Sequence, residues 1–482
     1  MMKKRLFTLL FFLSSAFLTL LSAQNIISVV GNPISGGYLK GGYSGDGGLA
    51  AAAELNSPYD IAFDASGNMF IADDGNNVIR EVDHTTGNIN TVAGNYTYGG
   101  GYSGDGGLAT AAELLGPASV AFDDSGNMAI ADYGNNIIRK IDHITGNIST
   151  MAGNYSYGGG YSGNSGPATA AELDGPTSIA FDTSGNLFIA EYGNNVIRKV
   201  DNGTGIISTF AGIHVGGYSG DGGPAIAAKL SSPVNIAFDH SGNLYISDYR
   251  NNVIREVNHS TGNITTVAGD TAHEQGYSGD GGTATAAGLN FPWGIAVNDS
   301  GSLFIADQFN NVIRGVSHSN GNIYTVAGNY NGGISGYSGD GGPATAAELK
   351  SPTGIAIDPA GNLFIADNGN NVIREITSVI KTGIEKVTSL SSNEVSVYPN
   401  PNNGNFEVFC HSVLPEAGEE SLPIIQVYNL LGEKVFTETL RPAIGGTQGD
   451  NTININSQPD GVYFMQIITS DGNITKRIVI ER

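Results

Sequence analysis

One phrase of about 59 residues occurs six times in this chain of 482 residues. Self-similarity at a fixed period of this length is typical of repeat architectures, in which each unit packs on its neighbours. The phrase contains NVIR or NIIR, and the intervals between successive copies are 59, 59, 57, 59 and 60 residues. The sequence therefore predicts six structural units, whose NVIR or NIIR ends at Arg80, Arg139, Arg198, Arg255, Arg314 and Arg374.

Each copy contains four short runs rich in Ile, Val, Phe and Thr, separated by turns of the D-x-SGN, D-x-GNN and TGN types. Such runs favour strands, and Gly-Asn turns favour antiparallel hairpins. The runs are apolar nearly throughout, so both faces of each sheet must be covered, as happens when blades stack around an axis. We predict an all-β fold, a six-bladed β-propeller over residues 24–377.

The phrase of the first strand and the phrase of the last strand each occur six times. The last-strand phrase occurs first in the chain, so the two series are offset by one strand. The sixth copy lacks its own last strand, whereas an orphan copy of that strand, IISVVG, occupies residues 26–31. An unpaired sheet edge is a liability that a spare strand removes. We therefore expect residues 26–31 to complete the sixth blade and close the ring.

The N-terminus and the composition place the chain outside the cytoplasm. Residues 1–23 read as a signal peptide, with a basic start, an apolar run and Ala23 at the expected cleavage site; an uncleaved membrane anchor is the alternative. Cys410 is the single cysteine, which excludes an intramolecular disulfide. A net charge of −23 disfavours nucleic acid and anionic membranes as partners, and leaves cations, neutral glycans and basic proteins.

The phrases IADDGNNVIR, IADYGNNIIR and GNLFIAD resemble NHL repeats, and GYSGDGGPATAAEL is similar to a bacterial subgroup of them. This resemblance implies a six-bladed propeller. It also implies a function drawn from protein, nucleic-acid or small-ligand binding, or, in a minority of relatives, catalysis in the central channel. Proteins with such repeats share the fold, but the fold does not determine their function.

The repeat pattern ends before a linker at residues 378–394, and a different set of sequence motifs follows the linker. Residues 395–482 contain YPNP, GEKV and GVYFMQI in that order, and resemble the type A sorting domain of the type IX secretion system. The resemblance implies a small β-sandwich-like domain, the type IX machinery as a partner, and a secreted or outer-membrane surface location in a Gram-negative bacterium. A generic adhesive β-sandwich is the alternative.

Several acids and histidines recur in every copy. The YSGDGG loops could bind Ca²⁺ through carboxylates and carbonyls, or form a turn in which the Asp caps a short helix and the Tyr packs on a neighbouring blade. Asp73 and its equivalents, seven residues before each repeated Arg, indicate a structural ion pair. His84, His143, His259 and His318 share one turn. We expect no cofactor, and Ca²⁺ stays open.

Function in a ring of repeats is better sought where the repeats differ, because few ligands have sixfold symmetry. Two positions vary against a constant frame: the residue after the Pro that opens each blade, and the residue after the second strand. Both should lie at the mouth of the channel on one face, called here the upper face, where the inter-blade loops emerge. Aromatics at this place suit sugar stacking or a protein anchor. The candidate ligand-binding residues are Tyr59, Tyr133, Tyr192, Tyr249, Arg250, Trp293 and Phe309.

Three classes of function remain open. The first is a secreted or cell-surface binding module for a glycan or protein. The second is a channel-centred enzyme of the lyase or lactonase type, which needs a non-repeating cluster of His and carboxylates around a metal. The histidines outside the turns, at His214, His240 and His273, show no ligand spacing, and we assign no catalytic or metal-binding residues. The third is a structural spacer.

Overall fold

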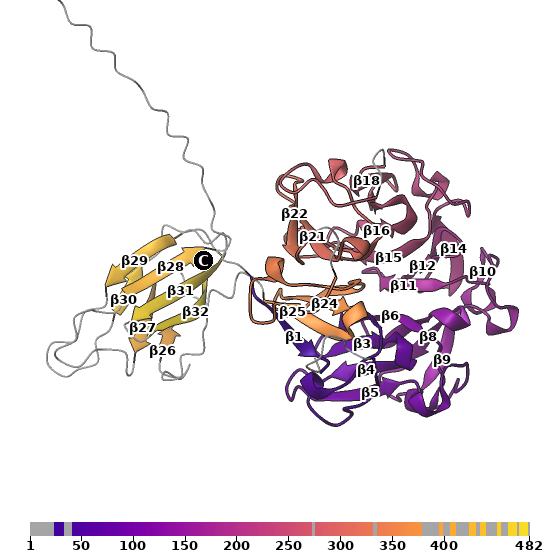
Figure 1. Ribbon diagram of the computed structural model, residues 1–482, viewed down its shortest axis with the longest axis horizontal. Coiled ribbons are helices and arrows are strands. Elements are labelled where there is room, and N and C mark those ends of the chain that lie inside the picture. Colours follow the sequence, from indigo (N-terminus) through magenta and orange to yellow (C-terminus); the bar gives the residue numbers. More distant parts are fainter. Residues whose placement is uncertain are drawn as a thin grey trace, which may run out of the picture. The chain divides into compact units, whose positions relative to one another are not determined.

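The computed structural model describes residues 24–32, 41–271, 275–330 and 335–377, and seven strands between residues 395 and 480. The expected signal peptide at residues 1–23 and linker at residues 378–394 lie outside the described residues. The chain forms two compact units, Met1–Ser378 and Val379–Arg482. The first unit is a six-bladed propeller (Figure 1), which confirms the predicted fold class.

Every blade is an antiparallel sheet, and in the first five blades the four main strands follow chain order from the axis to the rim (Figure 1). The repeat phrases become the strands, and the Gly-Asn turns become the hairpins between them. The first five blades are β2(Pro58–Phe63), β3(Met69–Asp73), β4(Val78–Val82), β5(Ile89–Ala93); β6(Pro117–Phe122), β7(Met128–Asp132), β8(Ile137–Ile141), β9(Ile148–Ala152); β11(Pro176–Phe181), β12(Leu187–Glu191), β13(Val196–Val200), β14(Ile206–Ala211); β15(Pro233–Phe238), β16(Leu244–Asp248), β17(Val253–Val257), β18(Ile264–Ala268); and β19(Pro292–Val297), β20(Leu303–Asp307), β21(Val312–Val316), β22(Ile323–Ala327).

The sixth blade is built from both ends of the propeller sequence. Its inner strands are β23(Ile355–Ile357), β24(Leu363–Asp367) and β25(Val372–Ile376), and its fourth strand is β1(Ile26–Val30). Strand β1 is antiparallel to β25, with Ile26 opposite Ile376, so the ring is joined by hydrogen bonds between segments 350 residues apart. This is the arrangement that the phase offset of the repeats predicts.

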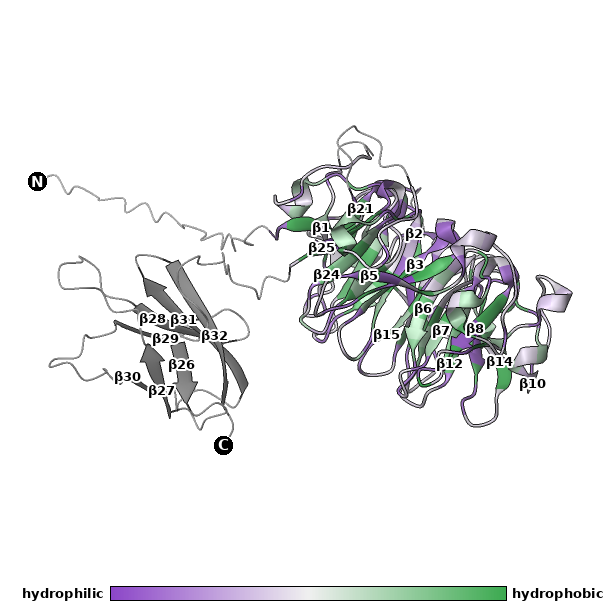
Figure 2. Ribbon diagram, turned by 90° about the horizontal axis from the view of Figure 1, so that it is seen from below, coloured by the Kyte–Doolittle hydropathy of each residue, from purple (hydrophilic) through white to green (hydrophobic). Residues whose placement is uncertain are grey.

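The core lies between the blades. In five blades all residues of the second strand are buried, because one face of each sheet meets the preceding blade and the other face meets the next. Apolar clusters combine residues of two adjacent blades, as where Ile79 of the first packs with Val120 of the second. Figure 2 shows the apolar colouring concentrated in the strands and the polar colouring in the loops. The uniformly apolar strand phrases therefore have a direct physical cause.

The YSGDGG loop covers the outer edge of the blade that it precedes. In the first blade the Gly47 N–H donates to the Ile89 carbonyl over 2.9 Å, and the Ile89 N–H donates to Gly48 over 2.8 Å. In the third blade the same pairing appears as a fifth strand, β10(Gly166–Pro167), next to β14. A single 3₁₀ turn follows, and in the first blade it is η1(Ala50–Ala52). The loop thus closes an edge that would otherwise be exposed.

The repeated Tyr and Asp of this loop lock a buried arginine, and the expectation that the Asp caps the short helix was wrong. Asp46 accepts a 2.7 Å bond from Arg80 Nη2 and a 2.9 Å bond from the Tyr43 hydroxyl. It does not cap the 3₁₀ turn, which begins without a side-chain cap. Tyr43 also bonds Thr91 of its own blade, and its ring stacks on Tyr96 of the loop that leads to the second blade, with centroids 4.1 Å apart. The Asp points inward because the guanidinium is fully buried and needs an anion.

The arginine also faces the acid at the end of the second strand, as the sequence predicts. Arg80 Nη1 lies 3.6 Å from Asp73 Oδ2, and both side chains are fully buried. Asp73 additionally accepts from the Asn56 N–H and from the Asn76 amide. Each arginine therefore joins the loop, the second strand and the third strand of one blade.

Six asparagines in the left-handed conformation join consecutive blades. Each is the second Asn of the turn, which reads GNN in four blades, RNN in the fourth and FNN in the fifth, and its Oδ1 accepts from the backbone N–H of the residue before the next blade's opening proline, over 2.7 to 2.8 Å. Asn tolerates this conformation better than most residues do. The GNN motif is thus an inter-blade connection at the upper face. The pairs are Asn77 with Gly116, Asn136 with Gly175, Asn195 with Ser232, Asn252 with Phe291, Asn311 with Ser351, and Asn371 with Ser57.

The second unit contains two antiparallel sheets. One has the order β26(Val395–Tyr398), β27(Asn405–Cys410), β30(Asn451–Asn454), and the other has β29(Lys434–Thr439), β28(Ile424–Asn429), β31(Gly461–Thr469), β32(Gly472–Ile480). The YPNP, GEKV and GVYFMQI blocks adjoin or begin strands of these sheets. The sandwich-like packing of the two sheets stays a prediction.

Candidate functional site: the channel mouth

The inter-blade loops and the turns between second and third strands meet at the upper face. The Gly75 N–H donates to the Asn56 carbonyl, and the Asn76 amide donates to Gly42. The residues that follow the opening prolines begin the innermost strands, and the residues that follow the second strands begin the adjoining turns. The structure therefore places both variable sets on this face.

Below the mouth, the third residue of each innermost strand forms part of an incomplete ring of hydrogen bonds. Ser119 Oγ accepts from the Ile179 N–H over 3.4 Å, and Asn235 Oδ1 accepts from the Ile295 N–H over 3.1 Å. Asp60 is the acid of this ring, and its carboxylate accepts from Ser119 and from the Val120 N–H. The ring stops at the fifth and sixth blades, whose third residues are glycines.

Those two glycines bring the innermost strands of the fifth, sixth and first blades unusually close. A Cβ on Gly294 would stand 2.3 Å from the Thr353 carbonyl oxygen, and a Cβ on Gly354 would stand 2.5 Å from the Asp60 Cα. Only glycine permits such backbone approach. As a result, Tyr59 of the first blade and Trp293 of the fifth meet across the sixth, with ring centroids 5.1 Å apart in an edge-to-face arrangement.

Further rings extend this contact into one continuous aromatic surface. Tyr249 lies 5.0 Å from Trp293 and 4.8 Å from Phe291, and Phe291 lies 5.1 Å from Phe309. These spacings and tilts are the favourable ones for aromatic pairs. Trp293 is 9% exposed whereas Phe309 is 49% exposed, so the surface runs from a buried anchor to an open rim. We call the set Tyr59, Tyr249, Phe291, Trp293 and Phe309 the mouth cluster.

Phe291 is held in a strained backbone conformation. Its φ is 51°, in the left-handed region that bulky residues rarely adopt. The five equivalent positions carry Ser57, Gly116, Gly175, Ser232 and Ser351, which are small residues suited to the N–H contact with the preceding blade's asparagine. A strained residue at a site persists when the surrounding structure holds it, and often marks function. Phe291 is therefore the one bulky residue among the six equivalent positions.

Polar groups flank the mouth cluster on the side of the second to fourth blades. Arg250 Nη2 donates to the Tyr192 hydroxyl over 3.0 Å, and the Tyr249 hydroxyl donates to Gln308 over 3.4 Å. Tyr192 and Tyr249 lie 6.4 Å apart. Tyr133 is 40% exposed on the second blade and makes no ring contact with the cluster among the described residues. The structure thus joins six of the seven predicted site residues through ring contacts and hydrogen bonds, and Tyr133 lies close to Tyr192, where both approach Gly175.

Burial shifts the acidity of several groups at this mouth. It raises the pKa of Tyr249 to about 12, and the pKa of Tyr59 well above its ordinary value, so both phenols are protonated at neutral pH. Burial also raises the pKa of Asp74, beside Tyr59, to about 6. Asp60 below them has its pKa raised to about 6 by burial, which outweighs the hydrogen bonds from Ser119, Ile61 and Val120. The mouth therefore offers hydroxyl donors and weakly acidic carboxyl groups beside apolar rings.

Sequence reasoning missed two residues, and a signal existed for each. Phe291 is the bulky exception at a position otherwise occupied by Gly and Ser. Asp60 is the acid at the second position after the opening proline, where the other copies have Ser119, Ser178, Asn235, Gly294 and Gly354. Both signals become visible only when the copies are aligned at positions next to the variable ones.

The repeated acids and histidines do not converge on the channel. Within the described ranges, no three residues among His, Cys, Asp and Glu are grouped so that they could hold a metal ion. The turn that carries a histidine bonds the adjacent turn of the same blade, as where the His143 backbone N–H donates to Asn127 Oδ1. In the part of the chain that the structure describes, no helix is long and apolar enough to cross a membrane.

Matches to two protein-family models agree with the division of the chain into two units. Residues 289–311 match the NHL repeat, and residues 396–481 match the secretion system C-terminal sorting domain. The chain thus carries NHL repeats and the sorting domain of an exported protein. The bovine NHL repeat-containing protein 2 is 26% identical over 353 residues, covering 65% of this chain and 46% of that protein. Human Teneurin-1 is 30% identical over 234 residues, covering 45% of this chain and 8% of that protein.

The chain spans a quarter or less of the length of the first curated relatives that it matches. One of them is the Arabidopsis thaliana protein SUPPRESSOR OF QUENCHING 1, which is 26% identical over a region that covers 54% of this chain and 25% of that protein. Among solved structures, an auxiliary nutrient binding protein from Bacteroides ovatus superposes with a TM-score of 0.53 at 16% identity, over 74% of this chain and 76% of that one. A second auxiliary nutrient binding protein, from Bacteroides thetaiotaomicron, gives a TM-score of 0.52 at 17% identity, over 73% and 75%. At these identities the likeness shows the fold.

Proposed function

We propose that this exported NHL-repeat propeller is a non-catalytic module that binds a neutral carbohydrate at its channel mouth. The observation that carries the proposal is the mouth cluster, in which five aromatic rings contact one another across the first, fourth and fifth blades, one of them on a strained backbone. A merely structural mouth has no use for the strained Phe291, because small residues serve the same contact in the other blades.

The chemistry of the mouth favours a sugar. Aromatic faces stack on the apolar C–H faces of sugar rings, while hydroxyl, amide and guanidinium groups bond the sugar hydroxyls. Phe309 and Arg250 are both exposed beside the buried Trp293, so the rim offers a stacking ring and a donor together. A neutral ligand also suits a chain of net charge −23, since an anionic one would be repelled. The two structural neighbours described as auxiliary nutrient binding proteins have a compatible role.

The test is binding of the full-length protein to a panel of neutral polysaccharides, followed by titration with the best oligosaccharide. We expect Phe309→Ala to weaken binding about tenfold, because a ring at a binding hot spot contributes one to two kcal/mol or more. The matched control is Tyr155→Ala. Tyr155 is also 49% exposed and also stacked on another ring, Tyr102, but it lies in an outer loop. Binding should survive this change.

A second variant separates the ring of Phe291 from the fold. Phe291→Ser installs the residue that the first, fourth and sixth blades use at this position, so the melting temperature should change little while binding falls. A blank polysaccharide panel, or equal effects of Phe309→Ala and Tyr155→Ala, would contradict the proposal. Capture of a protein ligand that depends on Phe309 would reassign the same surface to protein recognition.

A further inference from the structure

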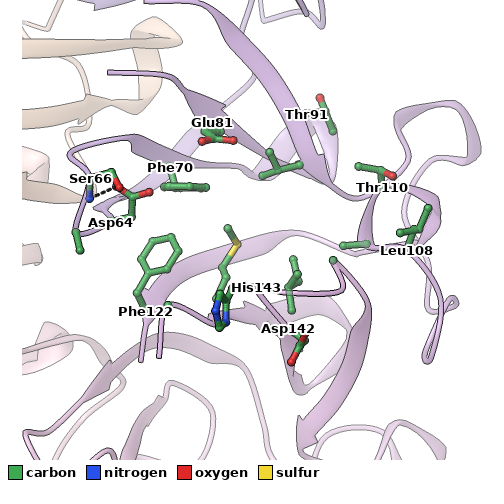
Figure 3. A pocket seen from close by; sticks show the side chains of 17 residues that line it. Asp64, Ser66, Phe70, Glu81, Thr91, Leu108, Thr110, Phe122, Asp142 and His143 are labelled. Atoms are coloured by element: carbon green, nitrogen blue, oxygen red, sulfur yellow. Dashed lines mark hydrogen bonds between the residues drawn. The ribbon is translucent and has the colours of Figure 1, made fainter. Parts of the chain in front are cut away.

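A groove separates the first and second blades at a distance from the channel mouth. It has a volume of about 490 Å³, and its lining includes Phe70, Phe122 and Met128 together with Asp64, Glu81 and His143. Figure 3 shows Glu81 and Asp64 beside the ring of Phe70, with Phe122 and His143 on the opposite wall. The groove thus has an aromatic ring on each wall and two carboxylates at one end.

In two of the other blades a lysine occupies this place. In the second blade Lys140 takes the position of Glu81, and its Nζ lies 3.2 Å from Asp123, which takes the position of Asp64. In the third blade Lys199 takes the same position, and its Nζ lies 5.4 Å above the ring of Phe188, which takes the position of Phe70. The same carboxylate and the same ring therefore each bind an ammonium group elsewhere in this chain.

The first blade has the carboxylate and the ring but replaces the lysine by a second acid. Asp64 accepts from the Ser66 and Asn68 N–H groups of its own turn, as Asp123 does from Ser125 and Asn127. Within the described residues, no cation contacts Asp64 or Glu81. Burial raises the pKa of Glu81, with the Asp64 and Asp83 carboxylates adding to the effect. A like-charged pair in a half-buried position gains from a cation brought from outside.

The fourth blade provides a contrast, whereas the sixth blade repeats the acid, the ring and the glutamate of the first with Asp358, Phe364 and Glu375. Glu256 of the fourth blade also follows the pattern of Glu81, but the hydroxyl of Tyr245 donates to it. The first blade has Phe70 at the tyrosine position, so Glu81 lacks that donor and Phe70 presents an apolar edge to the groove instead. Substituting Phe for Tyr leaves a carboxylate without that donor beside an aromatic ring, which is the combination that holds a lysine by charge and by cation–π contact.

We propose that the groove between the first and second blades is a docking site for a lysine side chain presented by a partner protein. The ammonium group lies between Asp64 and Glu81 over Phe70, where Lys140 and Lys199 lie in the neighbouring blades, and the aliphatic stem packs along Phe122 and Met128. The site is separate from the channel mouth, and it does not depend on the carbohydrate proposal.

The test uses Met128 as a local reporter. The chain has six methionines, so a spectrum of the full-length protein labelled with ¹³C-methyl methionine is simple, and Met128→Leu assigns the signal. The probe is Nα-acetyl-lysine N-methylamide, compared with Nα-acetyl-norleucine N-methylamide, which keeps the stem and lacks the ammonium group. We expect a saturable shift at Met128 with the lysine probe alone, weakened by added salt. Met151, in the groove between the second and third blades, should not move.

Two variants at one position make the outcome decisive. Glu81→Gln should weaken the lysine probe about threefold or more, as expected for the loss of one partly exposed ion pair. Glu81→Lys copies the second blade, so it should abolish saturation without lowering the melting temperature. Glu256→Gln is the matched control and should bind as the unmodified protein does. A motionless Met128, an equal response to the norleucine probe, or unchanged binding in Glu81→Gln would overturn the proposal.

Discussion

Asp60 shows how one residue can break the symmetry of a repeat fold. The equivalent residues of the other blades are Ser, Asn and Gly, and none of them carries a charge. Asp60 keeps some contact with water in the channel, yet the surrounding protein raises its pKa to about 6. A carboxyl group whose pKa is raised on folding favours the folded state when protonated. Its contribution to stability is therefore fully present below about pH 4 and is lost as the pH rises through about 6.

We expect Asp60→Asn to stabilise the propeller at pH 7.5 by about 1 to 2 kcal/mol, the size of a pKa shift of this order discounted for water in the channel. Asparagine fits because Asn235 holds the equivalent position in the fourth blade and accepts the same inter-blade N–H bond. Denaturant unfolding between pH 4 and 8 measures the effect, and the difference from the unmodified protein should shrink toward pH 4. Asp124→Asn, at an exposed turn, is the control. A difference that is constant with pH would refute the assignment.

At the scale of the blade, the buried arginine explains a paired exception in the repeats. The third blade has Asn164 where the other loops have Asp, and Glu191 where the other second strands end in Asp. The longer Glu191 brings its Oε1 to 3.1 Å from Arg198 Nη1, whereas the corresponding Asp distances are 3.4 to 3.7 Å. The loss of one anion is thus compensated by the closer approach of the other. The blade tolerates either anion arrangement, provided that the guanidinium is neutralised.

The second blade provides the test of this compensation. Asp105 bonds Arg139 over 2.6 Å, and Asp132 is the second acid. We expect Asp105→Asn to lower the free energy of unfolding by about 1 to 2 kcal/mol, because it removes a partly exposed partner of a buried charge. Adding Asp132→Glu, which reproduces the third blade, should recover at least half of the loss. Chemical denaturation of the single and double variants gives the coupling free energy, and a purely additive result would contradict the explanation.

At the scale of the whole molecule, the ring depends on β1, which joins the two ends of the propeller. Ile26 and Val30 of this strand are fully buried, and Ile26 packs with residues of the fifth and sixth blades. The sixth blade without it would expose the edge of β25 and part of two inter-blade cores. Closure by a strand from the opposite end makes the six blades one cooperative unit, whose stability cannot be assigned to single blades.

Deleting residues 25–31 from the mature chain should destabilise the entire propeller by at least about 3 kcal/mol, since two fully buried aliphatic side chains and a strand pairing are lost. Calorimetry should show one transition at a lower temperature, not the loss of a minor one. Ile26→Ala and Ile27→Ala are a matched pair for the same test, because Ile26 is fully buried and Ile27 is 39% exposed. Only the first should lower the melting temperature appreciably. An unchanged transition after the deletion would contradict the closure.

Local information was sufficient to predict the blade. Each strand phrase is apolar on both faces because it is packed on both faces, and each turn carries the Gly or Asn that its conformation requires, so the number of blades, the strand order and the closing strand follow from the repeat. The pairing of Asp73 with Arg80 follows for the same reason, since both belong to one hairpin. The family matches of the repeat and of the C-terminal domain agree with these local patterns.

The side-chain contacts at the channel mouth could be found only from the tertiary structure. The contact of Tyr59 with Trp293 depends on how closely the innermost strands of neighbouring blades approach, which Gly294 and Gly354 set through backbone distances that no repeat pattern encodes. The inward direction of Asp46 likewise follows from a buried charge that the loop sequence does not reveal. Repetition specifies what the blades have in common. The differences between blades acquire meaning only when the ring places residues from separate copies side by side.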